Sequence, residues 1–174
     1  VQLSYFYQLD NGPVQELDTS SVDLSGLEEG RHEFVVWGQD ASGDQTAKVT
    51  YKWAIDRTPP ETQASFTNEY KGNKFPVIAL EATDPALPDG TQQSAPTDFE
   101  YSIEEGKWVS FTSKAREWPF EKPLPYLSLG YMVQIRSIDN AGNVDPTPAT
   151  VDLRIFNTRP IFFYSVVAVL VVVL

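Results

Sequence analysis

The sequence predicts an all-β protein of two tandem antiparallel β-sandwiches, the first of them incomplete, followed by the start of a transmembrane helix. Short stretches alternate between apolar and polar residues, which is the pattern of strands that bury one face in a core. The same pattern recurs after about 100 residues. An uncharged apolar run then closes the chain, which indicates the membrane segment.

The clearest strand pair lies between Leu127 and Ile155. Its loop, Asp139–Asp145, is rich in Asp, Asn and Gly, which favour tight turns because they bond the local backbone or adopt positive φ. Apolar residues occupy every second position of the two flanking strands: Tyr131, Val133, Ile135, Val151, Leu153 and Ile155. This pattern predicts two antiparallel strands with one buried face.

A second copy of this stretch lies near the N-terminus. Setting Asp40 on Asp139 and Ile55 on Ile155 gives offsets of 99 and 100 residues. A repeat of this length indicates two copies of one domain, and the paired prolines between them predict a short, stiff linker. The expected divisions are a partial domain at 1–56, a complete domain at 57–157 and a juxtamembrane segment at 158–174.

Copy two holds about seven strand candidates, which suits a β-sandwich of immunoglobulin or fibronectin type. They are residues 62–66, 76–82, 99–103, 107–112, 117–120, 131–136 and 151–156. Copy one has no equivalent of the first two. We therefore expect residues 1–56 to form an open partial sheet, or to be completed by another chain, because half a sandwich leaves an apolar face uncovered.

The alternation also assigns a core to each copy. In copy one we expect Phe34, Val36, Tyr51 and Trp53 to be buried. In copy two the expected core residues are Trp108, Tyr131, Val133, Ile135 and Leu153. His32 takes the place of Tyr131 in the repeat, and we expect it at the edge of the core without a functional role.

Composition excludes several classes of function. The formal net charge is −11 and the 13 basic residues are scattered, which argues against nucleic acid because phosphate binding needs Lys and Arg clusters. There is no Cys and a single His, so thiolate metal sites and Ser-His relays lack their residues. Glu104 and Glu105 are expected on a solvated face, since neighbours on a strand point to opposite sides. We expect no enzyme activity and no cofactor.

The C-terminal run Ile161–Leu174 contains no charged residue. Fourteen helical residues span about 21 Å, which is part of a bilayer core. Pro160 suits a first helical turn, and Phe162, Phe163 and Tyr164 suit the membrane interface. We expect the start of a transmembrane helix; the alternative is a buried C-terminal strand, since Val-rich runs also favour sheets. The β domains are then expected on the periplasmic or extracellular side of a cell envelope.

Two further groups of residues are candidate sites. Asp139, Asn140, Asn143 and Asp145 place four oxygen-bearing side chains in one loop, and calcium takes six to eight oxygens. We favour the alternative of a hydrogen-bonded turn without metal. Val35 and Trp37 align with Gln134 and Arg136 on the outward strand face. An apolar pair there indicates either a protein interface or a Trp covered by its own loops.

The motifs D-x-A-G-N-x-D-x-T-P at Asp139–Pro148 and I-D-x-T-P-P-E-T at Ile55–Thr62 resemble the immunoglobulin-like modules of bacterial surface and sensor proteins. Copy two also resembles the three-tyrosine domain that closes the periplasmic region of bacterial sensor kinases. The matching residues are Tyr101, Trp108, Tyr126, Leu127, Gly130, Tyr131 and Arg136. This second resemblance covers the chain from Phe99 onward.

The resemblance implies a non-catalytic ectodomain stalk of a single-pass envelope protein, namely the membrane-proximal part that transmits a signal. Alternatives are a membrane-anchored adhesin or structural stalk, and a docking subunit of a membrane complex. The expected partners are another protein or an upstream domain of the same polypeptide, together with the membrane.

Overall fold

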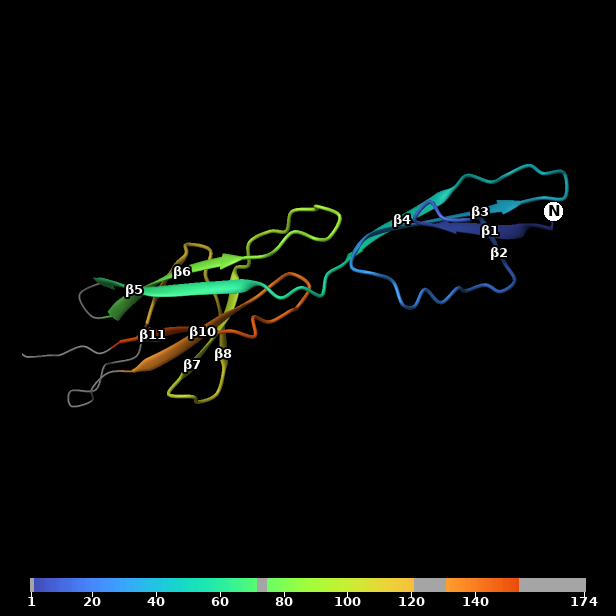
Figure 1. Cartoon of the computed structure of the whole chain (residues 1–174). Coiled ribbons are helices and arrows are strands. Elements are labelled where there is room, and N and C mark those ends of the chain that lie inside the picture. The colour runs from blue at the N-terminus through green and yellow to red at the C-terminus, as the bar shows by residue number, and fades with distance from the viewer. Residues whose placement is uncertain (1, 72–74, 121–130, 154–174) are drawn as a thin grey trace, which may run out of the picture. The chain divides into compact units, whose positions relative to one another are not determined.

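The computed structural model describes residues 2–71, 75–120 and 131–153 of the chain. By its internal contacts the chain divides into two compact units. Unit 1 consists of Val1–Thr58 and the loop Pro85–Gln93, and unit 2 of Pro59–Asp84 and Ser94–Leu174. Figure 1 shows that the described residues form strands and connecting loops. The prediction of an all-β protein is confirmed for this part of the chain.

Unit 1 contains one four-stranded antiparallel sheet, in the order β2-β1-β3-β4. Its strands are β1 (Ser4–Leu9), β2 (Gln15–Leu17), β3 (Gly30–Gln39) and β4 (Val49–Ile55). The described residues of this unit form no second sheet. One face of the sheet therefore has no facing β-layer within the described part of unit 1.

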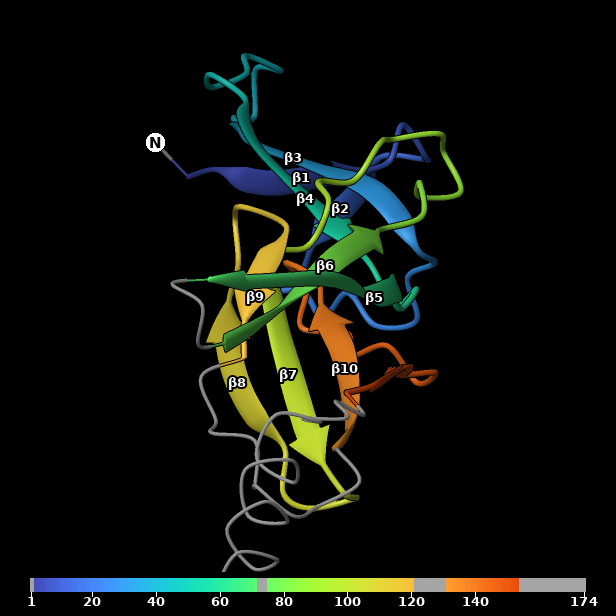
Figure 2. The ribbon, with the colours of Figure 1, turned by 90° about the vertical axis from the view of Figure 1, so that its left-hand side faces the viewer.

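Unit 2 contains two sheets, β11-β10-β7-β8 and β5-β6-β9, which lie across each other as two layers (Figure 2). Its strands are β5 (Glu61–Lys71), β6 (Phe75–Thr83), β7 (Asp98–Ile103), β8 (Val109–Thr112), β9 (Glu117–Pro119), β10 (Met132–Ile138) and β11 (Ala149–Asp152). The core of unit 2 is built from both sheets: Ile78, Leu80, Ala82, Phe99, Phe120, Val133, Ile135, Val151 and Leu153. Burial of this set is the main stabilising contribution to the unit.

The sheet of unit 1 repeats the sheet β8-β7-β10-β11 of unit 2 in order and in register. Tyr7 pairs with Val36 as Tyr101 pairs with Ile135. The turns after β3 and β10 also agree: Asp40 Oδ1 accepts bonds from the amides of Ser42 and Asp44, and Asp139 Oδ1 accepts from the equivalent amides. The offsets found in the sequence therefore correspond to equivalent positions in the two units.

Burial differs between the two units. Val133, Ile135 and Leu153 are fully buried, as predicted, whereas Trp108 is half-buried with its ring under the guanidinium of Arg136. In unit 1 the prediction for Tyr51 is wrong, because its side chain is 67% exposed. The remaining predicted core residues, Phe34, Val36, Trp53 and Tyr131, are half-buried. The predicted core of unit 1 is thus a partly exposed sheet face.

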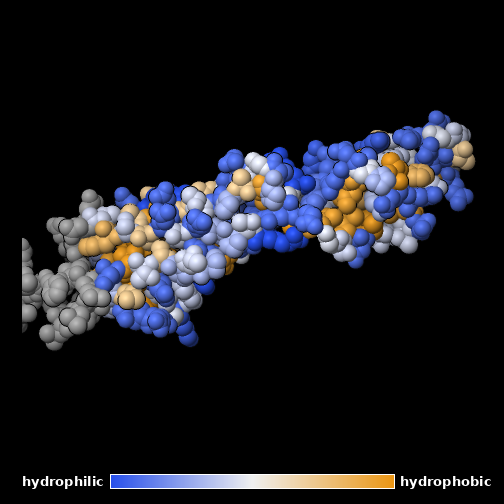
Figure 3. Space-filling view, viewed as in Figure 1, coloured by the Kyte–Doolittle hydropathy of each residue, from blue (hydrophilic) through white to orange (hydrophobic). Residues whose placement is uncertain are grey.

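The exposed large hydrophobic residues of unit 1 are Tyr5, Val14, Val49 and Tyr51, and Figure 3 shows apolar surface on this unit. Tyr5, Val49 and Tyr51 lie on the face shared by Val36 and Phe34, since paired residues point to the same side of a sheet. In unit 2 the matching face is covered by β5, β6 and β9. The residues of unit 2 are therefore more buried than their equivalents in unit 1 because a second sheet covers them.

The predicted membrane segment cannot be compared with the structure. Residues 154–174, with Phe162, Phe163 and Tyr164, lie outside the described residues. The described residues include no helix long and apolar enough to cross a bilayer.

Candidate functional site

The loop Asp139–Asp145 is held by hydrogen bonds that its own carboxylates accept. Asp139 accepts from the amides of Ala141 and Asn143 and from the side-chain amide of Asn143. Gly142 provides the positive φ of 93° that this turn requires. Asn140 is exposed. The geometry is that of an Asx-capped turn, in which backbone donors occupy the carboxylate of Asp139.

Asp145 binds a strand of the opposite sheet, whereas Asp139 binds only within its own turn in the bonds above. It is 1% exposed, and its Oδ2 accepts a bond of 2.8 Å from the amide of Thr62 in β5. Its Oδ1 accepts from the amide and hydroxyl of Thr147. The Thr62 hydroxyl in turn bonds the amide and hydroxyl of Ser137 in β10. This buried network fastens the first strand of unit 2 to the opposite sheet.

We predict that a chelator leaves the thermal midpoint of the chain unchanged, because both buried carboxylates of the loop already accept protein hydrogen bonds. The measurement is a thermal melt with about 1 mM EDTA, a concentration about a thousandfold above a micromolar dissociation constant for calcium. The control is the same melt with 1 mM calcium. A calcium-dependent rise of several degrees in the thermal midpoint would contradict this prediction and indicate that the loop binds calcium.

The predicted interface residues lie on β3. Val35 is half-buried, but Trp37 is only 6% exposed. The Trp37 ring stacks with Phe6 at 6.3 Å, and the Lys48 ammonium lies 4.4 Å from its centre. The alternative of a Trp covered by its own neighbours therefore describes its position. A protein partner on Val35 and Trp37 stays a prediction.

Glu104 and Glu105 lie in the turn after β7, with φ of 50° and 58°, and not on a strand. Both are exposed. Glu104 accepts a bond from the amide of Met132 through its carboxylate, and the carbonyl of Met132 accepts from its amide. Asp10 makes the same pair of bonds with Glu33 in unit 1. The acid at this turn position therefore ties the hairpin to its neighbouring strand in both units.

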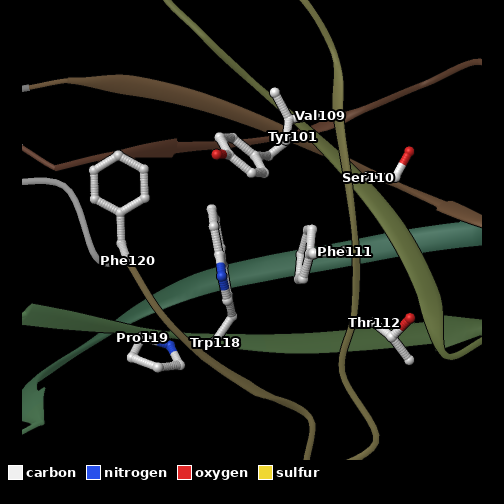
Figure 4. A pocket seen from close by; sticks show the side chains of 8 residues that line it. All are labelled: Tyr101, Val109, Ser110, Phe111, Thr112, Trp118, Pro119 and Phe120. Carbon is white, nitrogen blue, oxygen red and sulfur yellow. The ribbon is translucent and has the colours of Figure 1, made fainter.

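An aromatic groove of about 470 Å³ opens between β8 and β9 on one side of unit 2 (Figure 4). The ring of Trp118 stacks on Phe111 at 4.5 Å and lies 4.6 Å from Tyr101. The remaining lining residues are Val109, Ser110, Thr112, Pro119 and Phe120. Apart from the Tyr101 phenol, the described residues contribute no titratable side chain to its lining, so what they offer is packing surface and hydroxyl groups.

A polar site of unit 1 surrounds Glu29, just before β3. One carboxylate oxygen of Glu29 accepts bonds from the Arg57 amide at 2.9 Å, the Thr58 amide at 3.0 Å and the Thr58 hydroxyl at 2.8 Å. The Arg57 guanidinium donates to the carbonyl of Leu27. The pKa of Glu29 is lowered, chiefly by the bond from the Arg57 amide and then by that from the Thr58 hydroxyl. We call Leu27–Glu29 with Arg57 and Thr58 the linker clamp.

His32 connects the linker clamp to the sheet. It is 9% exposed; its Nδ1 lies 2.7 Å from Asp10 Oδ2 and its Nε2 lies 2.9 Å from the carbonyl oxygen of Glu28. The bond with Asp10, followed by that with Glu28, raises the pKa of His32 above 6.5. The predicted core-edge position agrees with this burial, whereas the bonds to Asp10 and Glu28 were not predicted from the sequence.

The comparisons with family models and with curated proteins gave no match. Among solved structures, the fibronectin(III)-like modules of Clostridium thermocellum CbhA are similar with a TM-score of 0.45 and 12% identity, over 87% of this chain and 77% of that chain. This likeness is too distant to support a function. The sandwich assignment of unit 2 rests on its own strand order and core.

Proposed function

We propose that this chain is a non-catalytic stalk of a single-pass bacterial envelope protein, and that it forms the membrane-proximal, signal-transmitting part of a sensor. In this proposal unit 1 is the C-terminal part of an immunoglobulin-like domain and unit 2 is a complete one. The apolar run after residue 160 enters the membrane, which places the β domains in the periplasm or outside the cell.

The observation that carries the proposal is the anchoring of the linker at both ends. Thr58 is bonded to Glu29 within unit 1, and Thr62 is bonded to Asp145 within unit 2. Only Pro59, Pro60 and Glu61 lie between these two anchored residues. Proline fixes φ near −65°, so few free torsions remain. A stalk that transmits a displacement requires a connection of this kind.

The proposal can be tested by NMR relaxation on the full chain. We expect the amides of both units to report one common rotational correlation time. The comparison variant carries Pro59→Gly and Glu29→Gln, which loosens the linker and leaves the fully buried Pro60 in place, and its two units should tumble separately. Separate tumbling in the unaltered chain would contradict a transmitting stalk.

A second experiment separates the sensor from a passive stalk or adhesin. A four-residue insertion, Gly-Ser-Gly-Ser, is placed between Pro59 and Pro60 in the intact protein. Both signal output and surface display are then measured. Loss of output with normal display supports transmission. Unchanged output overturns it.

Membrane attachment is tested in parallel: the full chain should sediment with membranes, and a chain ending at Leu153 should not.

One observation favours a docking role as a second candidate. Tyr5, Val49 and Tyr51 are 51%, 64% and 67% exposed on one face of unit 1, and exposed apolar patches of this kind mark interaction surfaces. The variant Tyr51→Lys distinguishes the two functions. A docking subunit would lose its partner, whereas a stalk would keep its signal output.

A further inference from the structure

The two oxygens that face His32 determine its proton state. A backbone carbonyl oxygen only accepts hydrogen bonds, and so does an ionised carboxylate. The Glu28 carbonyl therefore requires a proton on Nε2, and Asp10 requires one on Nδ1. Only the imidazolium carries both protons. The geometry around His32 is thus that of the charged form, with both ring nitrogens donating.

Several elements place charged or aromatic groups around His32, and of these Asp10 and Trp53 favour the charged form. Asp10 faces it from the β1–β2 turn. Burial acts to raise the pKa of Asp10, but the bonds from His32 and from the Glu33 amide together lower it. The Trp53 ring on β4 lies 5.4 Å away, where a cation is stabilised by the aromatic face. Arg57 acts in the opposite direction. Glu33 and Lys52 pair with each other on the opposite face of the sheet.

Loss of the proton leaves one donor for two acceptors. The charged Asp10 holds the remaining proton on Nδ1 more strongly than a neutral carbonyl holds one on Nε2. The Nε2 lone pair then faces the Glu28 oxygen across 2.9 Å, which is repulsive. Glu28 is released, and its neighbour Glu29 is the residue that binds Arg57 and Thr58.

We propose that His32 is a proton-operated latch: its imidazolium holds Leu27–Glu29 against β3, and this segment in turn holds the linker residues Arg57 and Thr58. A rise in pH through the titration of His32 opens the latch and loosens the linker clamp. Unit 2 has no such device, because Tyr131 stands at the equivalent position. The latch lies within unit 1 and does not depend on the stalk function proposed above.

The Asp10 carboxylate gives protons a route to His32. The Asp10 side chain is 40% exposed although that of His32 is 9% exposed. The pair therefore exchanges protons with solvent without unfolding of the sheet.

The test is an NMR titration of the full chain from about pH 5 to 9, a window around the ordinary His value. We expect the His32 ring to titrate above 6.5, and the amides of Glu28, Glu29, Arg57 and Thr58 to shift with the same midpoint. The Thr58 amide also donates to Asp56 Oδ1 at 3.0 Å, so above that midpoint its hydrogen-exchange protection should fall only in part, by about tenfold, as expected for local opening. A His32 titration midpoint at or below 6.5, or a Thr58 amide shift that does not follow this midpoint, overturns the latch.

Three variants make the test specific. Asp10→Asn should lower the His32 midpoint and carry the Thr58 transition with it. Glu29→Gln should loosen Thr58 at every pH and leave the His32 midpoint in place. His32→Tyr, which copies unit 2, should abolish the Thr58 transition; if this variant fails to fold, Asp10→Asn decides alone. The control Asp23→Asn, an exposed acid of the same loop, should change nothing. A Thr58 transition that persists in His32→Tyr would overturn the proposal.

Discussion

Leu153→Ala is expected to lower the free energy of unfolding of unit 2 by about 2–5 kcal/mol, the usual cost of deleting a buried leucine side chain. Leu153 is fully buried in the core cluster, and its amide donates to the carbonyl of Tyr131. The variant keeps that backbone bond and loses the packed side chain. The measurement is a denaturant titration followed by the amide signals of β10, which report unit 2 alone.

The matched control is Met132→Ala, which is 44% exposed and points away from the core next to Val133. Its effect should stay within about 0.5 kcal/mol. If Leu153→Ala costs less than about 1 kcal/mol, or no more than Met132→Ala, the register assigned to β10 and β11 is wrong.

Asp145→Asn is expected to lower the free energy of unfolding of unit 2 by about 3 kcal/mol, since a buried bond to a charged group is lost and a donor is left unsatisfied. Asn keeps the shape of Asp, but its single carbonyl oxygen serves either Thr62 or Thr147. Its NH₂ group then faces the other donor. The measurement is the same denaturant titration of unit 2.

The control for this variant is again Asp23→Asn, which replaces an exposed carboxylate and should be nearly neutral. A loss of less than about 1 kcal/mol for Asp145→Asn would show that water replaces the bond to Thr62. The anchoring of β5, and with it the stiffness of the linker, would then need another basis.

Much of the fold could be predicted from the sequence because its signals are local. Alternation in residues 131–136 and 151–156 indicated β10 and β11, and each of the seven predicted strands of unit 2 overlaps a strand of the structure. For the last of them the overlap is Val151–Asp152, and residues 154–156 lie outside the described residues. The repeat between Asp40 and Asp139 also corresponds to equivalent turns. These features depend on side-chain period and turn chemistry, which a single sequence displays directly.

Burial of single residues in unit 1 was harder to predict, because alternation does not report the facing layer. Only the comparison of the two copies indicated that unit 1 lacks the first two strands of unit 2. Tyr51 has the pattern of a core residue, yet nothing in the described part of unit 1 packs on it as a second sheet. Trp37 has the pattern of a surface residue, yet Phe6 and Lys48 cover it. Period-two alternation identifies a face and not what covers that face.

The polar sites depend on contacts distant in sequence. Glu29 lies 29 residues from Thr58, and Thr62 lies 83 residues from Asp145. No local motif reports such pairs. The repeat did carry one signal, since His32 replaces Tyr131 and Asp10 corresponds to Glu104. The sequence signal for the latch was therefore a titratable His32 in the place of an aromatic residue, together with the acidic Asp10 in the neighbouring turn.

Native-state hydrogen exchange on the full chain tests most directly whether unit 1 has one sheet where unit 2 has two. We predict that the amides of β10 exchange only through unfolding of unit 2, whereas those of β4, beneath Val49 and Tyr51, exchange at least about a hundredfold faster, since sparse burial permits local opening. Equal protection of β4 and β10 would contradict the account: it would mean that unit 1 is a closed domain as it stands, and that the repeat alignment misplaces its start.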